Sequence, residues 1–201
     1  MVKYTKIISM MVFYIILVAG LIIYFSVIRP PVAIKIHGTY MNSPNDITAV
    51  HLIDNDGKPF NRQNLLGHWT MLFFGFTHCP MICPTTLSLL NNMYKLLEKK
   101  LPDKQLPHIM LISVDPDRDS EEVLTQYVHG FNTQFTAARA NVTDILAFEQ
   151  QLHLVVSGNN PLNHSMDIIL VNPDAKVQAY FSYPHQADEL AKDYKAIVNQ
   201  P

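Results

Sequence analysis

Residues 69–84 read WTMLFFGFTHCPMICP, an apolar run followed at once by Cys79 and Cys83, the two cysteines of the chain. A short apolar run that ends at a turn is typical of a strand buried on both faces of a sheet. Residues 84–99 then repeat apolar side chains at helical spacing. The stretch therefore predicts a buried strand, a junction that carries both thiols, and a helix.

The spacing of the two thiols bears on their chemistry. Residues four apart on a helical turn have Cβ atoms about 5–6 Å apart, whereas a relaxed disulfide needs about 3.5–4.5 Å. A shared metal ion fits this gap more easily. Because thiolates are soft ligands that favour Cu(I), zinc or iron–sulfur centres, the spacing favours metal capture, with reversible disulfide chemistry as the second interpretation.

The rest of the folded part alternates strands and helices, which predicts an α/β fold with a mixed sheet flanked by helices. The expected elements are a hairpin over 49–60, a buried strand over 109–114, helices over 120–129 and 142–152, a hairpin over 168–181 and a helix over 187–198.

The N-terminal segment predicts a membrane anchor. Residues 7–28 form a run of 22 residues without a charged side chain, which as a helix is about 33 Å long and matches the hydrocarbon core of a bilayer. A cleaved secretory signal ending at Val18-Ala19-Gly20 is the competing interpretation. Lys3 and Lys6 precede the run, so the positive-inside bias leaves the N-terminus in the cytoplasm.

The first residues are neither rich in arginine nor amphipathic, which argues against an organelle transit peptide. We therefore expect a single-pass protein of the bacterial inner membrane whose soluble domain lies in the periplasm. The expected division is a membrane anchor at residues 1–28, a linker with several prolines at 29–47 and one domain at 48–201. We expect this anchored chain to be a monomer.

The charge of the chain narrows the possible partners. The net charge is −2 and both signs are scattered along the chain, so there is no basic stripe and we exclude nucleic acid as a partner.

In an oxidising compartment an even number of cysteines usually indicates a structural disulfide. A bridge across three intervening residues closes so short a loop that it removes little entropy from the unfolded chain, so stability alone does not require one.

Three motifs in this order resemble the SCO/SenC family of copper proteins. The first is the segment around the cysteines, residues 66–87; the second is SVDPDRD at 113–119; the third is NHS at 163–165. The resemblance runs from about residue 46 to residue 198 and implies a thioredoxin-like fold for the domain.

The resemblance also implies a function. Family members are membrane-anchored copper chaperones that serve assembly of the CuA centre of cytochrome c oxidase. Matched position by position, the ligands for copper, as Cu(I) or Cu(II), are Cys79, Cys83 and His164. The expected partner is the copper-bearing subunit of the oxidase or another periplasmic copper protein. Met81 and Asn163 stand where the family usually has aspartate, which changes the local charge.

The chemistry of these residues agrees with such a role. The start of a helix presents free backbone N–H groups and a partial positive charge, so we expect the thiol pKa values of Cys79 and Cys83 to be lowered and both to be ligands near neutral pH. Imidazole accepts both copper oxidation states. A third ligand from a separate loop, His164, would let the site close around the ion and open again.

Other candidates have ordinary structural explanations. Neighbouring strand residues point to opposite faces, so we expect His78 to shape the polarity around Cys79 instead of binding metal. Met81 is expected to be an exposed or packing side chain. Residues 115–119 follow a buried strand, where ligand sites of α/β proteins gather, but they equally suit capping of the next helix, and the sequence leaves both roles open.

Two further functions compete with the copper chaperone. The first is a thiol–disulfide oxidoreductase that keeps the copper-ligand cysteines of an oxidase subunit reduced, with Cys79 and Cys83 as its catalytic pair and His164 dispensable. The second is a peroxide-reducing or redox-sensing relative, for which the sequence offers no specific support. Thioredoxin-type catalysts have two residues between their cysteines, and the three found here favour metal binding.

Overall fold

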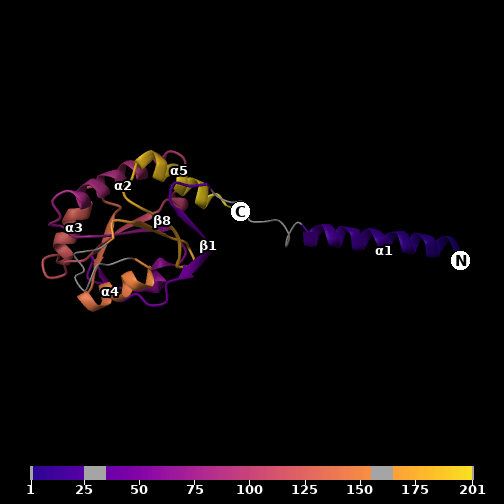
Figure 1. The fold of residues 1–201 in the computed structure, drawn as a ribbon, viewed down its shortest axis with the longest axis horizontal. Helices are drawn as coiled ribbons and strands as arrows, with labels where there is room; N and C mark the ends of the chain where they lie inside the picture. The colour runs from indigo at the N-terminus through magenta and orange to yellow at the C-terminus, as the bar shows by residue number, and fades with distance from the viewer. Residues whose placement is uncertain (1, 25–34, 155–164, 201) are drawn as a thin grey trace. The chain divides into compact units, whose positions relative to one another are not determined.

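The structure is a computed structural model that describes residues 2–24, 35–154 and 165–200. The chain divides into two compact units, residues 1–34 and 35–201. Helix α1, Val2–Ile23, belongs to the first unit, and the remaining elements belong to the second (Figure 1).

The predicted membrane span is not found. In the described part of the chain, no helix combines the length and the apolar character needed to cross a bilayer. Helix α1 spans Val2–Ile23 and so does not coincide with the predicted span of residues 7–28. The predicted location, a single-pass protein of the bacterial inner membrane with a periplasmic domain, is therefore wrong.

One eight-stranded mixed sheet forms the centre of the second unit as the structure describes it, in the order β1-β8-β7-β4-β5-β6-β2-β3. The strands are β1 Thr39–Asp46, β2 Leu52–Asp54, β3 Pro59–Phe60, β4 Thr70–Gly75, β5 His108–Ser113, β6 Thr136–Arg139, β7 Ile168–Val171 and β8 Lys176–Phe181. The helices are α2 Ile82–Glu98, α3 Glu121–His129, α4 Val142–Gln151 and α5 Ala187–Val198, with short 3₁₀ turns η2 Arg62–Leu65 and η3 Asp103–Gln105.

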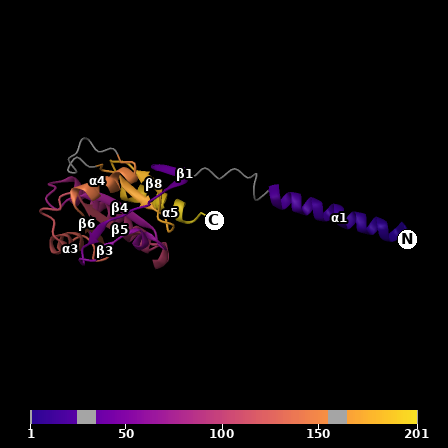
Figure 2. The ribbon, with the colours of Figure 1, turned by 90° about the horizontal axis from the view of Figure 1, so that it is seen from below.

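Helices cover both faces of the sheet. Along β4, Met71 and Phe73 join one core with the apolar faces of α2, α3 and α5, whereas Leu72 and Phe74 join a second core with α4. Figure 2 shows α4 and α3 on either side of the strands. Because successive strand residues point to opposite faces, an uninterrupted apolar strand is what this three-layer arrangement requires.

The central pairings confirm the predicted mixed sheet. Strand β4 runs parallel to β5 and antiparallel to β7, and all six of its residues are buried. Both predicted hairpins are present as the antiparallel pairs β2–β3 and β7–β8, and the last helix has the predicted bounds.

Two strands were not predicted. Strand β1 lies inside the segment expected to be a linker and pairs with β8 at the edge of the sheet, where a strand tolerates a proline such as Pro44. Strand β6 reads TAAR; alanine has little strand preference, and its buried Ala137 and Ala138 are held between β5 and β2. Pairing with neighbours, which no local pattern reveals, creates both strands.

The second core contains an acidic group. Glu149 of α4 has no exposed surface, and neither of its carboxylate oxygens has a hydrogen-bond partner among the residues that the structure describes. Burial raises the pKa of Glu149 from 4.5 to about 7. The carboxyl group is therefore a source of pH-dependent stability.

We predict that replacing Glu149 removes this dependence. The folded state holds the Glu149 proton more tightly than the unfolded chain does. The contribution of Glu149 to the free energy of unfolding is therefore fully present below pH 4.5 and falls by about 3 kcal/mol as the pH rises to about 7. Glu149→Met should abolish the fall and stabilise the protein at pH 8, as measured by urea unfolding at pH 5 and pH 8. Glu98→Met, at an exposed position of α2, is the control. An equal pH slope in wild type and Glu149→Met would contradict this assignment.

Candidate functional site

Both cysteines lie at the junction of β4 and α2. The N–H of Cys79 donates to the carbonyl oxygen of Phe76 at 3.2 Å, closing a turn after the strand. Helix α2 has Met81 as its N-cap residue, and no side chain of that residue caps the helix. The N–H of Cys83 instead donates to Sγ of Cys79 at 3.4 Å. The first thiol thus occupies the place of a capping oxygen.

The two thiols differ in exposure although they belong to one motif. Both are free, Cys79 is partly exposed and Cys83 is completely buried. Cys83 lies in the second position of α2, on the side of the helix that packs into the first core. A reagent or partner arriving from solvent therefore meets Cys79 first.

The position of Cys79 favours its thiolate. Burial by itself raises the pKa of this thiol, but backbone N–H groups of Cys83, Met81 and Ile82, together with the Cys83 thiol, direct hydrogen bonds toward the sulfur and lower its pKa below the ordinary value of 9.0. The lowered pKa that we expected for a thiol at the start of a helix is therefore found at Cys79.

The same expectation is wrong for Cys83. Burial raises the pKa of the Cys83 thiol to about 12. A hydrogen bond from the backbone of Phe76 acts against this rise, and the negative charges of Cys79 and Asp119 add to it. Removing the charged sulfur from water outweighs the field of the helix terminus. Cys83 is therefore a neutral thiol near pH 7 in the absence of metal, and it must lose its proton before it can act as a ligand.

Gly75 makes room for the buried sulfur, a role that was missed in the sequence. A Cβ atom at this position would lie 2.8 Å from Sγ of Cys83 and 3.2 Å from side-chain carbons of Leu111 and Phe73. A glycine inside a strand pattern often marks such a close approach. Its place at the end of the apolar run, four residues before Cys79, was the available signal.

A buried carboxylate stands beside the motif. Asp119 has no exposed surface and accepts hydrogen bonds from the N–H of Thr77 at 3.1 Å, from Oγ1 of Thr77 at 2.5 Å and from Oγ of Ser113 at 2.6 Å. The last rung of the β4–β5 ladder pairs Gly75 with Ser113. The segments that follow β4 and β5 therefore leave the sheet at the same end of the strands. The sequence left two roles open for residues 115–119, capping of the next helix and a place near the site. Asp119 has the second.

The other members of these motifs make local contacts. Nδ1 of His78 lies 3.0 Å from Oγ1 of Thr77 and 3.9 Å from a carboxylate oxygen of Asp119. Asp115 and Arg118 form an ion pair with each other. Met81 is 66% exposed, as expected for a side chain outside the core.

The predicted third ligand, His164, lies outside the described residues. Within residues 2–24, 35–154 and 165–200, no three His, Cys, Asp or Glu side chains are arranged to hold a metal ion. The described chain resumes at Ser165, and β7 then begins at Ile168 opposite Phe73 of β4. The segment that follows His164 therefore enters the sheet beside the strand that leads to Cys79.

Two further histidine clusters lie away from this junction. The rings of His68 and His108 stack at a centroid distance of 3.8 Å, and burial together with the charge of His68 lowers the pKa of His108. His108 pairs with Thr70 in the first rung of the β4–β5 ladder. The stack of His68 and His108 therefore lies at the end of these strands opposite the cysteines. No pattern in the sequence indicates that His68 and His108 meet.

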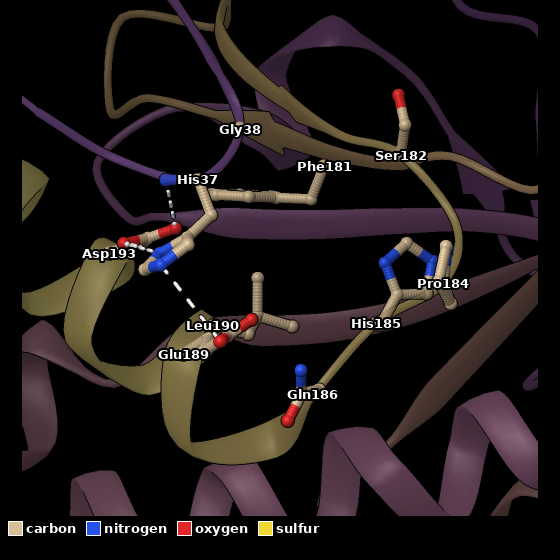
Figure 3. A pocket seen from close by; sticks show the side chains of 10 residues that line it. All are labelled: His37, Gly38, Phe181, Ser182, Pro184, His185, Gln186, Glu189, Leu190 and Asp193. Atoms are coloured by element: carbon tan, nitrogen blue, oxygen red, sulfur yellow. Dashed lines mark hydrogen bonds and ion pairs between the residues drawn. The ribbon is translucent and has the colours of Figure 1, made fainter.

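The second cluster borders a small pocket (Figure 3). The N–H of His37 donates to Asp193 at 2.8 Å, Nδ1 of His37 lies 3.2 Å from the same carboxylate, and Nε2 lies 3.9 Å from Glu189. Figure 3 shows the ring of His185 on the other side of the pocket. The contacts of His37 fasten the beginning of the second unit to α5.

The chain is similar to known proteins in sequence and in fold. The profile of the SCO1/SenC family matches residues 42–199, which include both cysteines and Asp119. A mitochondrial SCO2 homolog of Danio rerio is 30% identical over 154 residues, 72% of this chain and 54% of that protein. An SCO2-like protein of Rickettsia typhi is 33% identical over 150 residues, 71% of this chain and 72% of that protein. The chain thus spans about half the length of the Danio rerio relative.

A solved structure agrees in fold. The crystal structure of Arabidopsis thaliana ScoI with copper bound superposes with a TM-score of 0.68 at 27% sequence identity, covering 76% of this chain and 98% of that one. The predicted thioredoxin-like fold, a mixed sheet flanked by helices, is confirmed. The expectation of copper agrees with what that relative carries.

We predict that iodoacetamide distinguishes the two thiols. Because only the thiolate reacts and the pKa of Cys79 is lowered while that of Cys83 is raised to about 12, Cys79 should be modified first, with a half-maximal rate below pH 9. Mass spectrometry of peptides after graded exposure would measure this order, with Cys79→Ser and Cys83→Ser identifying each product. Equal rates for both thiols in the folded protein would refute the assignment.

We also predict that Gly75→Ala disturbs the buried thiol. The added Cβ overlaps Sγ of Cys83, and such overpacking typically costs about 1–3 kcal/mol of unfolding free energy. In a double-mutant cycle, Cys83→Ala should relieve part of this loss because the overlapping sulfur is gone. Additive effects of the two substitutions in urea unfolding would show that Gly75 and Cys83 are not in contact.

Proposed function

This chain belongs to the SCO1/SenC family, and on that premise we propose that it binds copper through Cys79, Cys83 and His164 and assists assembly of the CuA centre of cytochrome c oxidase. The observation that carries the proposal is the thiol pair at the start of α2, where backbone N–H groups stabilise the Cys79 thiolate directly beside the buried Cys83. Two sulfur donors, one just before the helix and one in its first turn, form a soft site that suits copper.

The fold supports a third ligand from the segment before β7. Ile168 of β7 pairs with Phe73, and β4 then continues for two residues toward the turn that carries Cys79. Ser165, the neighbour of His164, bonds to Asp167 at 2.7 Å and so belongs to the chain just before that strand. Only a short stretch of chain separates His164 from the start of β7, so this residue could serve as a ligand near the turn that carries Cys79.

Metal capture on this pair would occur in two steps. Cys79 is partly exposed and has a lowered pKa, so it takes the ion first; Cys83 follows when the bound cation displaces its proton. A site whose second thiolate forms only with metal releases the ion when that proton returns. Such a balance suits delivery to a partner, here the copper-bearing subunit of the oxidase, better than permanent storage.

One observation favours thiol–disulfide exchange as the second candidate function. A thiol of low pKa at the surface and a thiol of high pKa beneath it are the arrangement of an attacking and a resolving cysteine. The Cys79 thiolate would attack a partner's disulfide and release one partner thiolate. Cys83 would then lose its proton and attack the mixed disulfide, leaving the partner as a dithiol and this chain with a Cys79–Cys83 bridge.

We predict that copper affinity separates the two functions. In the reduced full-length chain, Cys79→Ser, Cys83→Ser and His164→Ala should each weaken copper binding by about a hundredfold or more, because removal of a direct ligand exceeds the 10- to 100-fold effect of an outer-shell change. Competition with a chelator of known affinity, performed with Cu(I) and with Cu(II), would measure the loss.

His129→Ala is the matched control for the third ligand, because His129 is an exposed histidine that lines a pocket with Thr70 and His108, at the end of β4 and β5 opposite the cysteines. Full copper affinity in His164→Ala, combined with loss of disulfide-reducing activity in both cysteine variants, would transfer the function to thiol–disulfide exchange. Full affinity in all three variants would reject copper binding at this site.

A further inference from the structure

Helices α2 and α5 pack against each other on one face of the sheet (Figure 1). A groove of about 430 Å³ lies between the last turn of α2 and the outer side of α5. Its apolar lining comes from Leu96 and Leu97 of α2 and from Ala191 and Ala196 of α5. Leu97 and Ala191 also belong to the first core. The groove is therefore an apolar hollow on the outside of the helix layer.

Small side chains on α5 keep this groove open. One side of α5 lines it, with residues at intervals of three or four positions, which share a face of a helix: Asp188, Ala191, Lys195 and Asn199. Ala191 has only a methyl group to fill that side, and Ala196 beside it is exposed. A segment of another protein can therefore come close to the backbone of α5.

The charged side chains around the groove are mostly lysines. Three of the four are Lys100, Lys192 and Lys195, and the fourth is Asp188. Nζ of Lys192 lies 3.3 Å from a carboxylate oxygen of Asp188, and both side chains are exposed. Three lysines and one aspartate leave the groove with a charge of +2, whereas the whole chain has a net charge of −2. The groove therefore attracts negative charge.

The helix ends account for only part of this positive charge. Lys195 lies in the last turn of α5 and Lys100 follows the end of α2, where a positive side chain interacts favourably with the helix dipole. Lys192 lies in the middle of α5, outside its last turn. The dipole of neither helix requires an apolar hollow between lysines from both.

We propose that this groove docks a partner protein through an acidic amphipathic segment. Apolar side chains of the segment would fill the hollow, and its carboxylates would pair with Lys100, Lys192 and Lys195. The complementary charge is the reason for an acidic occupant. The concave lining favours a protein segment over a lipid surface, because a bilayer is entered by apolar side chains that protrude.

A partner in this groove would leave the thiol pair open. Helix α2 begins one residue before Cys83 and ends just after Leu97, and these two residues are about 21 Å apart along the helix axis. Cys79 is partly exposed and lies before the start of α2, at the end away from the groove. Docking and exchange at the thiols can therefore take place together, whichever of the two candidate functions is correct.

The test is peptide binding to the full-length chain. The probe is a fluorescently labelled helical peptide with leucines on one side and glutamates beside them, and its binding is followed by fluorescence anisotropy. Lys192→Glu should weaken binding about tenfold, because an attraction becomes a repulsion. Added salt should weaken binding to the wild type, because it screens the exposed charges. An unchanged affinity in Lys192→Glu would overturn the proposal.

Lys58→Glu is the matched control. The side chains of Lys58 and Lys192 are 72% and 71% exposed, and each Nζ lies 3.3 Å from an aspartate oxygen. Both substitutions therefore change the net charge equally and break a similar ion pair. Lys58 lies between β2 and β3, outside the groove, so its substitution should leave peptide binding unchanged. Equal weakening by both substitutions would assign binding to overall charge and overturn the proposal.

The shape of the groove is tested without a change of charge. Ala196→Gln places a longer polar side chain in the hollow at an exposed position, so it should weaken peptide binding severalfold and leave the thermal midpoint unchanged. A peptide of the same composition in scrambled order has no apolar side and should bind at least tenfold more weakly. Equally tight binding of the scrambled peptide would overturn the proposal.

Other occupants of the groove are outcomes of the same experiments. Vesicles of phosphatidylserine and phosphatidylcholine that bind the wild type but not Lys192→Glu, with no binding of the peptide, would assign the groove to a membrane. Self-association of the wild type that Lys192→Glu abolishes in analytical ultracentrifugation would assign it to a second copy of the chain. Either result would overturn the proposal.

Discussion

Burial of β4 on both faces of the sheet fixes where the two thiols stand. Phe73 and Phe74 point into opposite cores and neither has any exposed surface, while β5 and β7 hydrogen-bond to the two edges of the strand. A strand held on four sides cannot slide or tilt without opening two cores. The turn after Gly75 and the start of α2 therefore follow a strand whose position is fixed.

This rigid junction makes two identical side chains chemically different. At Cys79, N–H groups of the helix start outweigh the effect of burial and the pKa falls. At Cys83, four residues further and inside the helix, burial dominates and the pKa rises. The charge of Asp119 adds to the second effect and is itself held by Thr77 and Ser113. One thiol is ready for a metal or a disulfide, and the other responds only after the first has reacted. This asymmetry is common to both candidate functions.

Residues outside the cysteine motif shape the surroundings of the buried thiol. Gly75 leaves space for the sulfur of Cys83, and the carboxylate of Asp119 is held beside the motif by Thr77 and Ser113. These residues come from β4, from the turn after it and from β5 and the segment that follows. The core and the neighbouring loops therefore contribute to the site as well as the motif does.

The sequence by itself determined the order of elements, the buried central strand, the position of both cysteines and the family, because apolar periodicity, turn residues and local motifs are properties of neighbouring residues. It predicted a membrane span at residues 7–28 that the described part of the chain does not contain, and it treated Cys79 and Cys83 alike. Only the tertiary structure decided that Cys83 is buried, that Glu149 lies in a core, that His68 meets His108 and that β6 exists. Each of these follows from contacts between segments distant in the chain, and burial and pairing of that kind leave no periodic trace in the sequence.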